Sequence, residues 1–491
     1  MSLTLAQLLG GATVAGDVVI SGMTVDSRRV KAGDLFVALP GSKVDGRLFI
    51  PAAIEAGAAA ILTTDGYNAD ELGVPVIEDA NPRRRYAQLA ARLCGRQPEI
   101  QVAVTGTNGK TSVADFARQL WEATGDAAAS VGTLGVRSNR YEEPGGLTTP
   151  DPMALHRALN MLAIKGVNHV AIEASSHGLD QFRLDGMRLK AAAFTNLTRD
   201  HLDYHKTEQG YFYAKARLFG DLIGPGGTAV INVDDPWGCI LEDIAWARGL
   251  SLITVGRSKD AVLQLVSQQV TPAGQRIEIR FCGSDYTVDL PLVGDFQAHN
   301  ALVAAGLVIA TGGEAGAVFR ALEILKGVPG RMELIGQTTS GGSVFVDYAH
   351  TPDGLKTVLK AARSHKPNSL HVVFGCGGDR DAGKRPQMGE IAATLADHVY
   401  VTDDNPRSES AAAIRKDIMV ACPNAMEIGD RRAAIATAMA VLGQGDMLIV
   451  AGKGHEEGQT VGNKVLPFSD IGVVREILAG VPGRSSGAIG G

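Results

Sequence analysis

The chain has 491 residues, of which 45% are hydrophobic and 20% charged, and its formal net charge is −6. This length exceeds what one core supports and fits about three domains, and the negative charge argues against a general nucleic-acid binder. The five scattered cysteines include no Cys-x-x-Cys pair, which indicates free thiols in a reducing compartment. No apolar run reaches 18 residues and no signal pattern is present, so we expect a cytoplasmic protein without a membrane span.

Residues 1–98 are predicted to form a small α/β domain, with strands at 17–20, 34–38 and 60–63 and a last helix at 81–94. Residues 99–330 alternate apolar strands with loops and helices, a pattern typical of a buried parallel sheet. Its expected strands are 102–104, 169–172, 191–194 and 228–233, and a helix is expected at 298–311. Residues 331–491 repeat the theme, with strands at 343–346, 371–374, 398–402 and 447–450. The fold class is therefore α/β, in three domains.

Polar clusters follow the predicted strands of both larger domains. In the central domain they begin at Glu173 and Thr195, and in the last domain at Asp347, Asp403 and Gly452. Ligands of open parallel sheets bind beyond the carboxyl ends of the strands. We therefore expect each of these two domains to gather its clusters in one cleft.

The segment after the strand at 102–104 has the chemistry of a nucleotide triphosphate site. Its residues are Gly106, Thr107, Asn108, Gly109, Lys110, Thr111 and Ser112. The glycines let several backbone N–H groups face one anion, and the following helix offers its positive N-terminus. Lys110 is expected to reach the β- and γ-phosphates of ATP and Thr111 to bind Mg²⁺. A tight strand-to-helix turn alone does not account for the Lys-Thr-Ser triplet.

An ATP enzyme also needs further Mg²⁺ ligands. Glu173, at a strand end, and His201, in a run of charged and aromatic residues, are the candidates. Taken alone, each of these two residues has an ordinary structural alternative.

Taken together, the motifs resemble the Mur ligase family of ATP-dependent amide-forming enzymes in peptidoglycan precursor synthesis. They are, in chain order, GTNGKTS, EASSHGLDQFRLDG, TNLTRDHLDYH, YFYAKARLF, GVPGRME, DYAHTPDGL, FGCGGDRDAGKRP, DNPR and AGKGHE. The resemblance implies a UDP-substrate-binding domain at 1–98, a P-loop ATPase domain at 99–330 and a Rossmann-like amino-acid-binding domain at 331–491. It is strongest to members that add meso-diaminopimelate to the D-glutamate γ-carboxyl of UDP-N-acetylmuramoyl-L-alanyl-D-glutamate through an acyl phosphate. Such members are usually monomers.

The resemblance also implies roles for single residues. Lys215 matches a lysine that carries a CO₂-derived carbamate, and as such it would join Thr111, Glu173 and His201 as a metal ligand. Asn300, Arg331, Asp347 and His350 match positions on the ATP side, whereas Gln297 stands where many relatives carry Asn. The positions that match contacts to the UDP-substrate are Val25, Ser27, Ser42, Lys43, Val44, Thr148, Thr149, Ser175, Gln181 and Arg183.

The choice of amino acid is predicted from Asp404-Asn405-Pro406-Arg407, the motif of diaminopimelate-adding members. Diaminopimelate ends in an amine and a carboxylate, and a guanidinium pairs with that carboxylate through two hydrogen bonds. Lysine ends in an ammonium alone, which Arg407 would repel. The remaining matching contacts are Arg380, Gly452 and Glu456, the last suited to the distal ammonium.

Three alternatives are weighed against this interpretation. A lysine-adding ligase would usually lack the arginine of the motif. Folylpolyglutamate synthetase shares the GTNGKTS-type loop, but it does not account for residues 404–407 or for the separate amino-terminal domain. A nucleotide switch would need an Asn-Lys-x-Asp motif for guanine, and the sequence has none.

Overall fold

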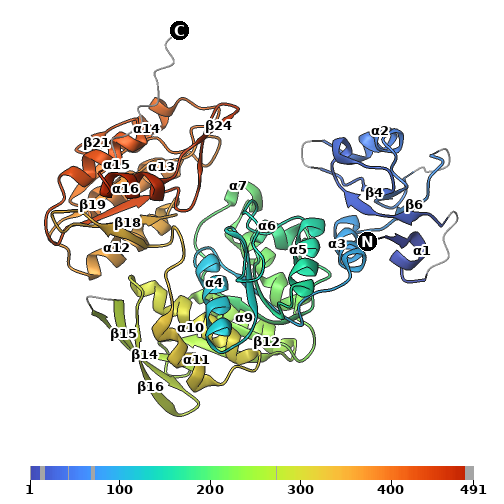
Figure 1. Ribbon diagram of the computed structural model, residues 1–491, viewed down its shortest axis with the longest axis horizontal. Coiled ribbons are helices and arrows are strands. Elements are labelled where there is room, and N and C mark those ends of the chain that lie inside the picture. Colours follow the sequence, from blue (N-terminus) through green and yellow to red (C-terminus); the bar gives the residue numbers. More distant parts are fainter. Residues whose placement is uncertain (1, 12–16, 42–43, 68–71, 272–273, 481–491) are drawn as a thin grey trace, which may run out of the picture. The chain divides into compact units, whose positions relative to one another are not determined.

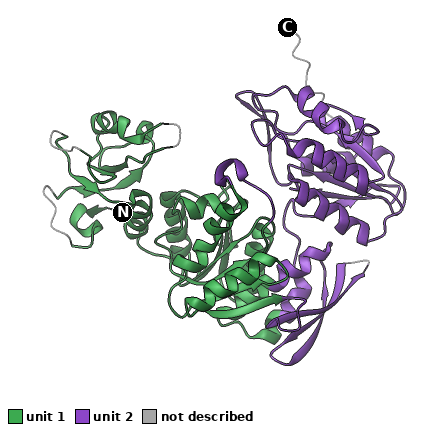
Figure 2. Cartoon of the chain, turned by 180° about the vertical axis from the view of Figure 1, so that it is seen from behind, with its two compact units in different colours: residues 1–197, 207–255, 303–318 green, residues 198–206, 256–302, 319–491 purple. Residues whose placement is uncertain are grey.

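The computed structural model describes residues 2–11, 17–41, 44–67, 72–271 and 274–480, and it confirms the α/β class (Figure 1). The chain divides into two compact units (Figure 2). Unit 1 comprises residues 1–197, 207–255 and 303–318, and unit 2 comprises residues 198–206, 256–302 and 319–491.

The amino-terminal part of unit 1 contains a four-stranded parallel sheet. Its strands, in spatial order, are β3 (Gly22–Thr24), β4 (Asp34–Val37), β5 (Ala60–Thr63) and β6 (Val76–Glu78). The expected strand at 17–20 is wrong in part, because only β2 (Val19–Ile20) forms and it pairs antiparallel with β1 (Leu3–Thr4). The other elements of this part are α1 (Leu5–Leu8), η1 (Ser27–Arg29), η2 (Gly46–Phe49), α2 (Ile50–Glu55) and α3 (Pro82–Cys94).

Helix α3 confirms the expected helix at 81–94. It begins with the side chain of Asn81 accepting the N–H of Arg84 and has Pro82 in its first turn, and it ends before Gly95 at φ 82°. Tyr86, Leu89 and Leu93 turn its apolar face into the core of the small sheet.

The larger part of unit 1 is a sheet with the strand order β13-β12-β11-β7-β10-β8-β9. All of its neighbours are parallel except β8 and β9. The strands are β7 (Ile100–Thr105), β8 (Ala128–Gly132), β9 (Gly135–Arg137), β10 (His169–Glu173), β11 (Leu189–Phe194), β12 (Thr228–Asn232) and β13 (Ser251–Gly256). The helices are α4 (Lys110–Ala123), α5 (Pro152–Ile164), α6 (Ser176–Asp180), α8 (Glu208–Arg217), the π-helix η3 (Leu218–Leu222) and α9 (Pro236–Ala247).

The expected parallel strands at 102–104, 169–172, 191–194 and 228–233 are confirmed as β7, β10, β11 and β12. Val102, Ala103 and Val104 are fully buried, which fits a strand that is covered on both faces. Because β7 lies between β10 and β11, the loops that follow these three strands leave the same edge of the sheet.

Unit 2 contains an antiparallel meander that the sequence analysis missed. Its strands are β14 (Leu263–Thr271), β15 (Gly274–Phe281) and β16 (Ser284–Leu290). The alternating burial of Arg276–Phe281 is the period-2 pattern of a half-exposed strand, and a search for continuous apolar runs passes over it. The helices α7 (Leu202–His205) and α11 (Ala315–Ala321) and the turn η4 (Leu322–Ile324) are further elements of the chain. The helix expected at 298–311 is α10 (Asp295–Ala310).

The carboxy-terminal part of unit 2 is a sheet in the order β17-β18-β22-β19-β20-β21, in which only β17 is antiparallel to its neighbour. Its strands are β17 (Glu333–Gln337), β18 (Ser343–Asp347), β19 (Leu370–Phe374), β20 (His398–Val401), β21 (Met426–Glu427) and β22 (Met447–Ala451). The strands expected at 343–346, 371–374, 398–402 and 447–450 are thereby confirmed as β18, β19, β20 and β22.

Two layers of helices cover this sheet. Helices α12 (Pro352–Ser364), α13 (Lys384–Leu395) and α14 (Ala411–Met419) share one hydrophobic core with it, and α15 (Arg431–Ala440) and α16 (Asp470–Leu478) share another. A hairpin of β23 (Gly458–Val461) and β24 (Lys464–Pro467) follows β22. The strands of each large sheet come from one of the segments 1–98, 99–330 and 331–491, whose boundaries stay predictions. Among the described helices, none is long and apolar enough to cross a membrane.

Helices α15 and α16 are joined by two ion pairs that differ in burial. Arg431 and Asp470 are both fully buried, with Nη2 and Oδ2 2.7 Å apart, whereas Arg432 and Glu476 are partly exposed. Removing one member of a buried pair leaves an uncompensated charge, which costs about 3–5 kcal/mol. An exposed pair contributes less than about 1 kcal/mol.

We therefore predict that Asp470→Ala lowers the free energy of unfolding of the carboxy-terminal sheet by about 3–5 kcal/mol, whereas Glu476→Ala lowers it by less than about 1 kcal/mol. Urea titration followed by fluorescence and circular dichroism measures both. Equal losses in the two variants would contradict the prediction.

Candidate functional site

The phosphate loop of unit 1 connects β7 to α4 and depends on two glycines. Gly109 has φ 87° and stands immediately before the first residue of α4, Lys110. Gly106 has φ 153°, and a Cβ added there would overlap Oγ1 of Thr195 at the end of β11. The loop therefore curls in a way that larger residues resist, which is the backbone form of an anion cradle.

Two lysines meet at the carbonyl of Gly106. Lys110 donates from Nζ to the carbonyl oxygens of Gly106 and Thr107, both at 2.8 Å. Lys215, on α8, donates from Nζ to the same oxygen of Gly106 at 2.7 Å. It is 1% exposed, and its Nζ lies 4.3 Å from the centre of the Tyr211 ring. Two lysine side chains thus share one acceptor, and Lys215 is buried there.

The carboxylate of Glu173, at the end of β10, accepts hydrogen bonds from Thr111 and from Thr133. Its Oε2 accepts the hydroxyl of Thr111 at 2.9 Å and that of Thr133 at 3.2 Å, and its Oε1 accepts the Thr133 N–H at 2.8 Å. The carboxylate is 2% exposed and keeps its place through these donors. Carboxylate and hydroxyl oxygens are the ligands that Mg²⁺ prefers, so the two predicted ligands Thr111 and Glu173 fit this ion. The described residues include no metal cluster of three or more His, Cys, Asp or Glu.

The residues that follow β11, one of the polar clusters expected at a strand end, bind the phosphate loop. Thr195 donates from Oγ1 to the carbonyl of Asn108 at 2.6 Å. Asn196 accepts the N–H of Asn108 on its side chain at 2.9 Å and the N–H of Thr107 on its carbonyl at 2.8 Å. Their position directly after a predicted strand was the available signal. Ser112, on the first turn of α4, is buried.

The predicted contacts to the UDP-substrate in this part of unit 1 form one connected network. Thr149 donates to the carbonyl of Glu173 at 2.8 Å, and the N–H of Ser175 donates to the Thr149 hydroxyl at 2.9 Å. Arg183 donates to the carbonyl of Thr149 at 2.6 Å and to Oε1 of Gln181 at 2.8 Å. Thr148 accepts the hydroxyl of Thr133 at 3.2 Å. All five predicted residues are thus linked to Glu173.

The remaining predicted UDP contacts lie in the small sheet. Val25 is 46% and Val44 53% exposed, so each presents an apolar side chain to solvent. Ser27 begins the turn η1, which the carboxylate of Asp26 caps. Ser42 and Lys43 lie outside the described residues.

His201, the fourth predicted metal ligand, belongs to unit 2 in the segment 198–206. It has φ 53°, and its Nε2 lies 3.4 Å from Oδ2 of Asp200. The metal role of this histidine stays a prediction.

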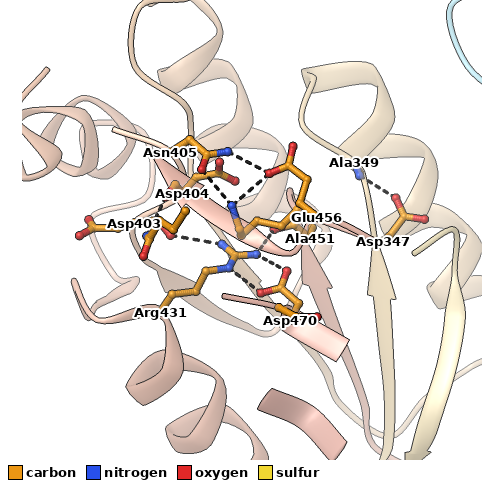
Figure 3. Close-up of polar contacts among 12 residues, drawn as sticks. Asp347, Ala349, Asp403, Asp404, Asn405, Arg431, Ala451, Glu456 and Asp470 are labelled. Carbon is orange, nitrogen blue, oxygen red and sulfur yellow. Dashed lines mark hydrogen bonds and ion pairs between the residues drawn. The ribbon is translucent and has the colours of Figure 1, made fainter. Parts of the chain in front are cut away.

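Asp347, at the end of β18, is one of the residues of unit 2 that are predicted on the ATP side. Asp347 accepts the N–H of Met332 at 2.7 Å and the N–H of Ala349 at 2.7 Å, and Figure 3 shows the second of these bonds. The first of these bonds fixes the segment that carries Arg331, whose guanidinium carbon lies 4.5 Å from the centre of the Tyr348 ring. Burial raises the pKa of Asp347 to about 6, against the lowering effect of Arg331.

His350 and Asn300 are two further residues that are predicted on the ATP side. Burial, and next the charge of Lys384, lower the pKa of His350, so the ring is held in the neutral form. Asn300 donates from Nδ2 to Oε1 of Gln297 at 3.1 Å on α10, and both side chains are buried. Gln297 therefore orients Asn300.

The predicted amino-acid site lies at the ends of β20 and β22. Asn405 donates from Nδ2 to Oε2 of Glu456 at 2.9 Å, so the two predicted contacts meet (Figure 3). Lys453, which the sequence analysis missed inside its own AGKGHE motif, donates to Oδ1 of Asn405 at 3.0 Å and to Oε2 of Glu456 at 3.1 Å. Asp404 and Pro406 are buried beside them.

Arg407 is held by its backbone as well as by its side chain. Its φ is 52°, its N–H donates to the carbonyl of Thr460 on β23, and Nη1 donates to the carbonyl of Gly378 at 2.7 Å. Arg380 is exposed on the loop that contains Gly378. Gly452 has φ 118°, and a Cβ there would stand 2.7 Å from Oδ2 of Asp404. The fixed Arg407 and the exposed Arg380 supply the positive charge that a carboxylate ligand needs.

Comparison with known families gives one consistent result. Residues 104–308 match the Mur ligase middle domain, residues 330–454 match the Mur ligase glutamate ligase domain, and residues 19–93 match the Mur ligase family catalytic domain. The chain is 56% identical over 466 residues to the UDP-N-acetylmuramoyl-L-alanyl-D-glutamate–2,6-diaminopimelate ligase of Chelativorans sp., covering 95% of this chain and 96% of the relative. It is 52% identical to the ligase of the same name from Caulobacter vibrioides, covering 95% and 97%.

Solved structures agree. A structure of a ligase with the same name has a TM-score of 0.71 at 33% identity and covers 98% of this chain and 99% of its own. A folylpolyglutamate synthase of Mycobacterium tuberculosis, complexed with ADP and AMPPCP, has a TM-score of 0.62 at 20% identity and covers 75% and 92%. The second likeness shows a shared fold alone.

We predict that Gly106→Ala weakens ATP binding at least tenfold, because the added methyl group collides with Thr195 and strains the phosphate loop. Isothermal titration with ATP and Mg²⁺ measures this. Gly224→Ala is the matched control, since no atom lies within 4 Å of the added Cβ. The affinity of this variant for ATP should equal that of the wild type. An unchanged affinity in Gly106→Ala would contradict the assignment of the loop.

Proposed function

The chain belongs to the Mur ligase family, and we propose that it joins meso-diaminopimelate to the D-glutamyl γ-carboxylate of UDP-N-acetylmuramoyl-L-alanyl-D-glutamate, converting ATP to ADP and phosphate. Full-length identity to ligases of that name carries the choice of substrates. The contacts among the phosphate loop, Glu173 and Thr149 support the choice of chemistry.

The reaction needs ATP because a free carboxylate repels nucleophiles and has no leaving group. Transfer of the γ-phosphoryl group of ATP to the γ-carboxylate gives an acyl phosphate. The amine of diaminopimelate attacks its carbonyl carbon, the tetrahedral intermediate expels phosphate, and the amine loses a proton. Lys110 offers a cation to the phosphates, and Thr111 and Glu173 would hold a Mg²⁺ ion, which would neutralise further phosphate charge. Arg331, Asn300, Asp347 and His350 are proposed as further ATP contacts.

A carbamate on Lys215 is part of this proposal. Lys215 and Lys110 donate to the same carbonyl, and as two ammonium groups they repel each other. Addition of CO₂ to the neutral amine gives a carbamate and a proton, and the repulsion becomes an attraction. A carbamate keeps one N–H for the Gly106 carbonyl and offers two oxygens, the donor type that suits Mg²⁺. His201 is proposed as a further ligand.

Selection of diaminopimelate is proposed to depend on charge. The guanidinium of Arg407 suits the distal carboxylate, Arg380 adds positive charge, and Glu456 suits the distal ammonium. L-Lysine lacks the distal carboxylate and would leave Arg407 without its anion. Folylpolyglutamate synthesis is disfavoured because the likeness to that enzyme extends to the fold alone.

We propose that the protein acts in the cytoplasm as a monomer. Its five cysteines are all free, which fits a reducing compartment. ATP and the nucleotide-linked substrate are soluble small molecules, so catalysis requires no membrane span and no nucleic acid.

The first test is phosphate release with ATP, Mg²⁺ and UDP-N-acetylmuramoyl-L-alanyl-D-glutamate. We expect release that depends on meso-diaminopimelate and is at least tenfold slower with L-lysine. Preference for lysine would keep the ligase and overturn the role of Arg407. No release with either amine would overturn the proposed function, and glutamate addition to a folate would then be assayed.

In the same assay, Arg407→Ala is expected to raise the KM for diaminopimelate about 30-fold, corresponding to a lost charge-assisted hydrogen bond of about 2 kcal/mol. The KM for ATP should change less than twofold. Arg475→Ala, at a 66% exposed arginine, is the control and should leave both constants unchanged. Equal effects of Arg407→Ala on both substrates would make this residue structural.

Lys215→Ala is predicted to lower kcat at least a hundredfold, with partial recovery on adding a short-chain carboxylic acid, which replaces the missing anion. The exposed Lys190, changed to Ala, serves as the control. A carbamate also has its own signal, a ¹³C resonance that appears in the wild type with ¹³C-bicarbonate and is absent from Lys215→Ala. Wild-type turnover in the alanine variant would remove the carbamate from the mechanism.

A further inference from the structure

Lys453 is a buried cation whose two side-chain partners, Asn405 and Glu456, belong to the proposed amino-acid site. It follows β22 directly, and its side chain is 0% exposed. Burying an ammonium is costly unless it is paired. Its partners are Asn405 at 3.0 Å and Glu456 at 3.1 Å, two residues of the proposed amino-acid site rather than of the sheet core. The fully buried cation of the core is Arg431, which pairs with Asp470.

Lys453 determines how the side chain of Asn405 is oriented. Oδ1 of Asn405 accepts from Nζ of Lys453 and, at 2.9 Å, from the N–H of Thr460. With its oxygen between two donors, the amide must direct Nδ2 to Glu456, where it donates to Oε2 at 2.9 Å. Without Lys453, Thr460 alone would hold the oxygen.

Lys453 also fixes Glu456. The Glu456 side chain is 32% exposed, so it could otherwise turn into solvent. Both of its bonds, from Lys453 and from Asn405, end on Oε2. A ligand ammonium is therefore expected at Oε1.

We propose that Lys453 is a positioning residue that sets affinity and selectivity for the amino acid without touching it, an inference that rests on the proposed function. It orients Asn405 and Glu456, and its charge balances that of Glu456. The distal end of diaminopimelate is neutral overall, with one ammonium and one carboxylate, whereas that of lysine is a cation. Loss of the Lys453 charge makes the site more negative, which disfavours the carboxylate of diaminopimelate and favours lysine.

The test is Lys453→Met in the complete enzyme, with meso-diaminopimelate and L-lysine as alternative amines. We expect the KM for diaminopimelate to rise at least tenfold and the ratio of kcat/KM between diaminopimelate and lysine to fall at least tenfold. The KM for ATP and the melting temperature should stay near the wild-type values. Glu457→Gln, at the exposed neighbouring position, is the control and should change none of these quantities.

A double-mutant cycle with Glu456→Gln tests whether Lys453 acts through Glu456. If it does, adding Lys453→Met to Glu456→Gln should change the KM for diaminopimelate less than threefold. Independent, multiplying effects would overturn the proposal. An equal loss of activity toward both amines, or failure of both Lys453→Met and Lys453→Gln to fold, would also overturn it and make Lys453 structural.

The phosphate-release assay on the wild-type enzyme separates a failure of the proposed function from a failure of the positioning role of Lys453. Wild-type enzyme without diaminopimelate-dependent phosphate release would overturn the proposed function, and the role of Lys453 would fall with it. An active wild type whose amine selectivity survives in Lys453→Met would overturn the positioning role alone.

Discussion

The carboxylate of Glu173 is the point on which the site in unit 1 depends. It accepts donors from α4, through Thr111, and from the loop after β8, through Thr133, while its main-chain carbonyl accepts the Thr149 hydroxyl. These segments lie apart in the sequence and meet because β10 lies between β7 and β8 in the sheet. A buried carboxylate without such donors would be costly. The phosphate loop and the network of Thr149 and Arg183 are thus both hydrogen-bonded to Glu173, the loop through Thr111 and the network through Thr149.

The proposed amino-acid site in unit 2 is likewise built from segments that lie apart in the sequence. The strand ends supply Asn405 and Lys453, and the hairpin β23–β24 supplies backbone groups of Thr460 that bind both Asn405 and Arg407. Arg407 at φ 52° occupies a conformation that a non-glycine residue adopts at some cost. The backbone bonds on either side stabilise it. The direction of its guanidinium is therefore set by the fold around it rather than by solvent.

The sequence predicted strands and ligand-binding edges best where a buried apolar strand is followed directly by polar residues. Strands such as β7, β10, β18 and β22 are continuous apolar runs followed by polar residues, so both their existence and the edge that carries ligands could be predicted. The meander β14–β16 could not be found from apolar runs, because its residues alternate between buried and exposed. The short β3 contains a glycine and gives little signal. The individual roles of Lys453 and Thr195 within their predicted clusters could not be predicted, for another reason. Their importance lies in partners distant along the chain, Asn405 and Asn108, which only the folded structure brings near.

Charge is arranged differently at the two sites, and the chemistry explains the difference. Near the phosphate loop, Lys110 lies against the carbonyls of Gly106 and Thr107, and its positive charge suits a ligand that arrives with several negative charges. At the proposed amino-acid site, Lys453 and Glu456 bring opposite charges 3.1 Å apart, and Arg407, held by the carbonyl of Gly378, adds a further positive charge. A zwitterionic end group is matched by alternating charges, since either sign in excess would reject one half of it. The buried Lys453 keeps that alternation where solvent cannot screen it, so discrimination between two similar amines depends on a residue that neither of them contacts.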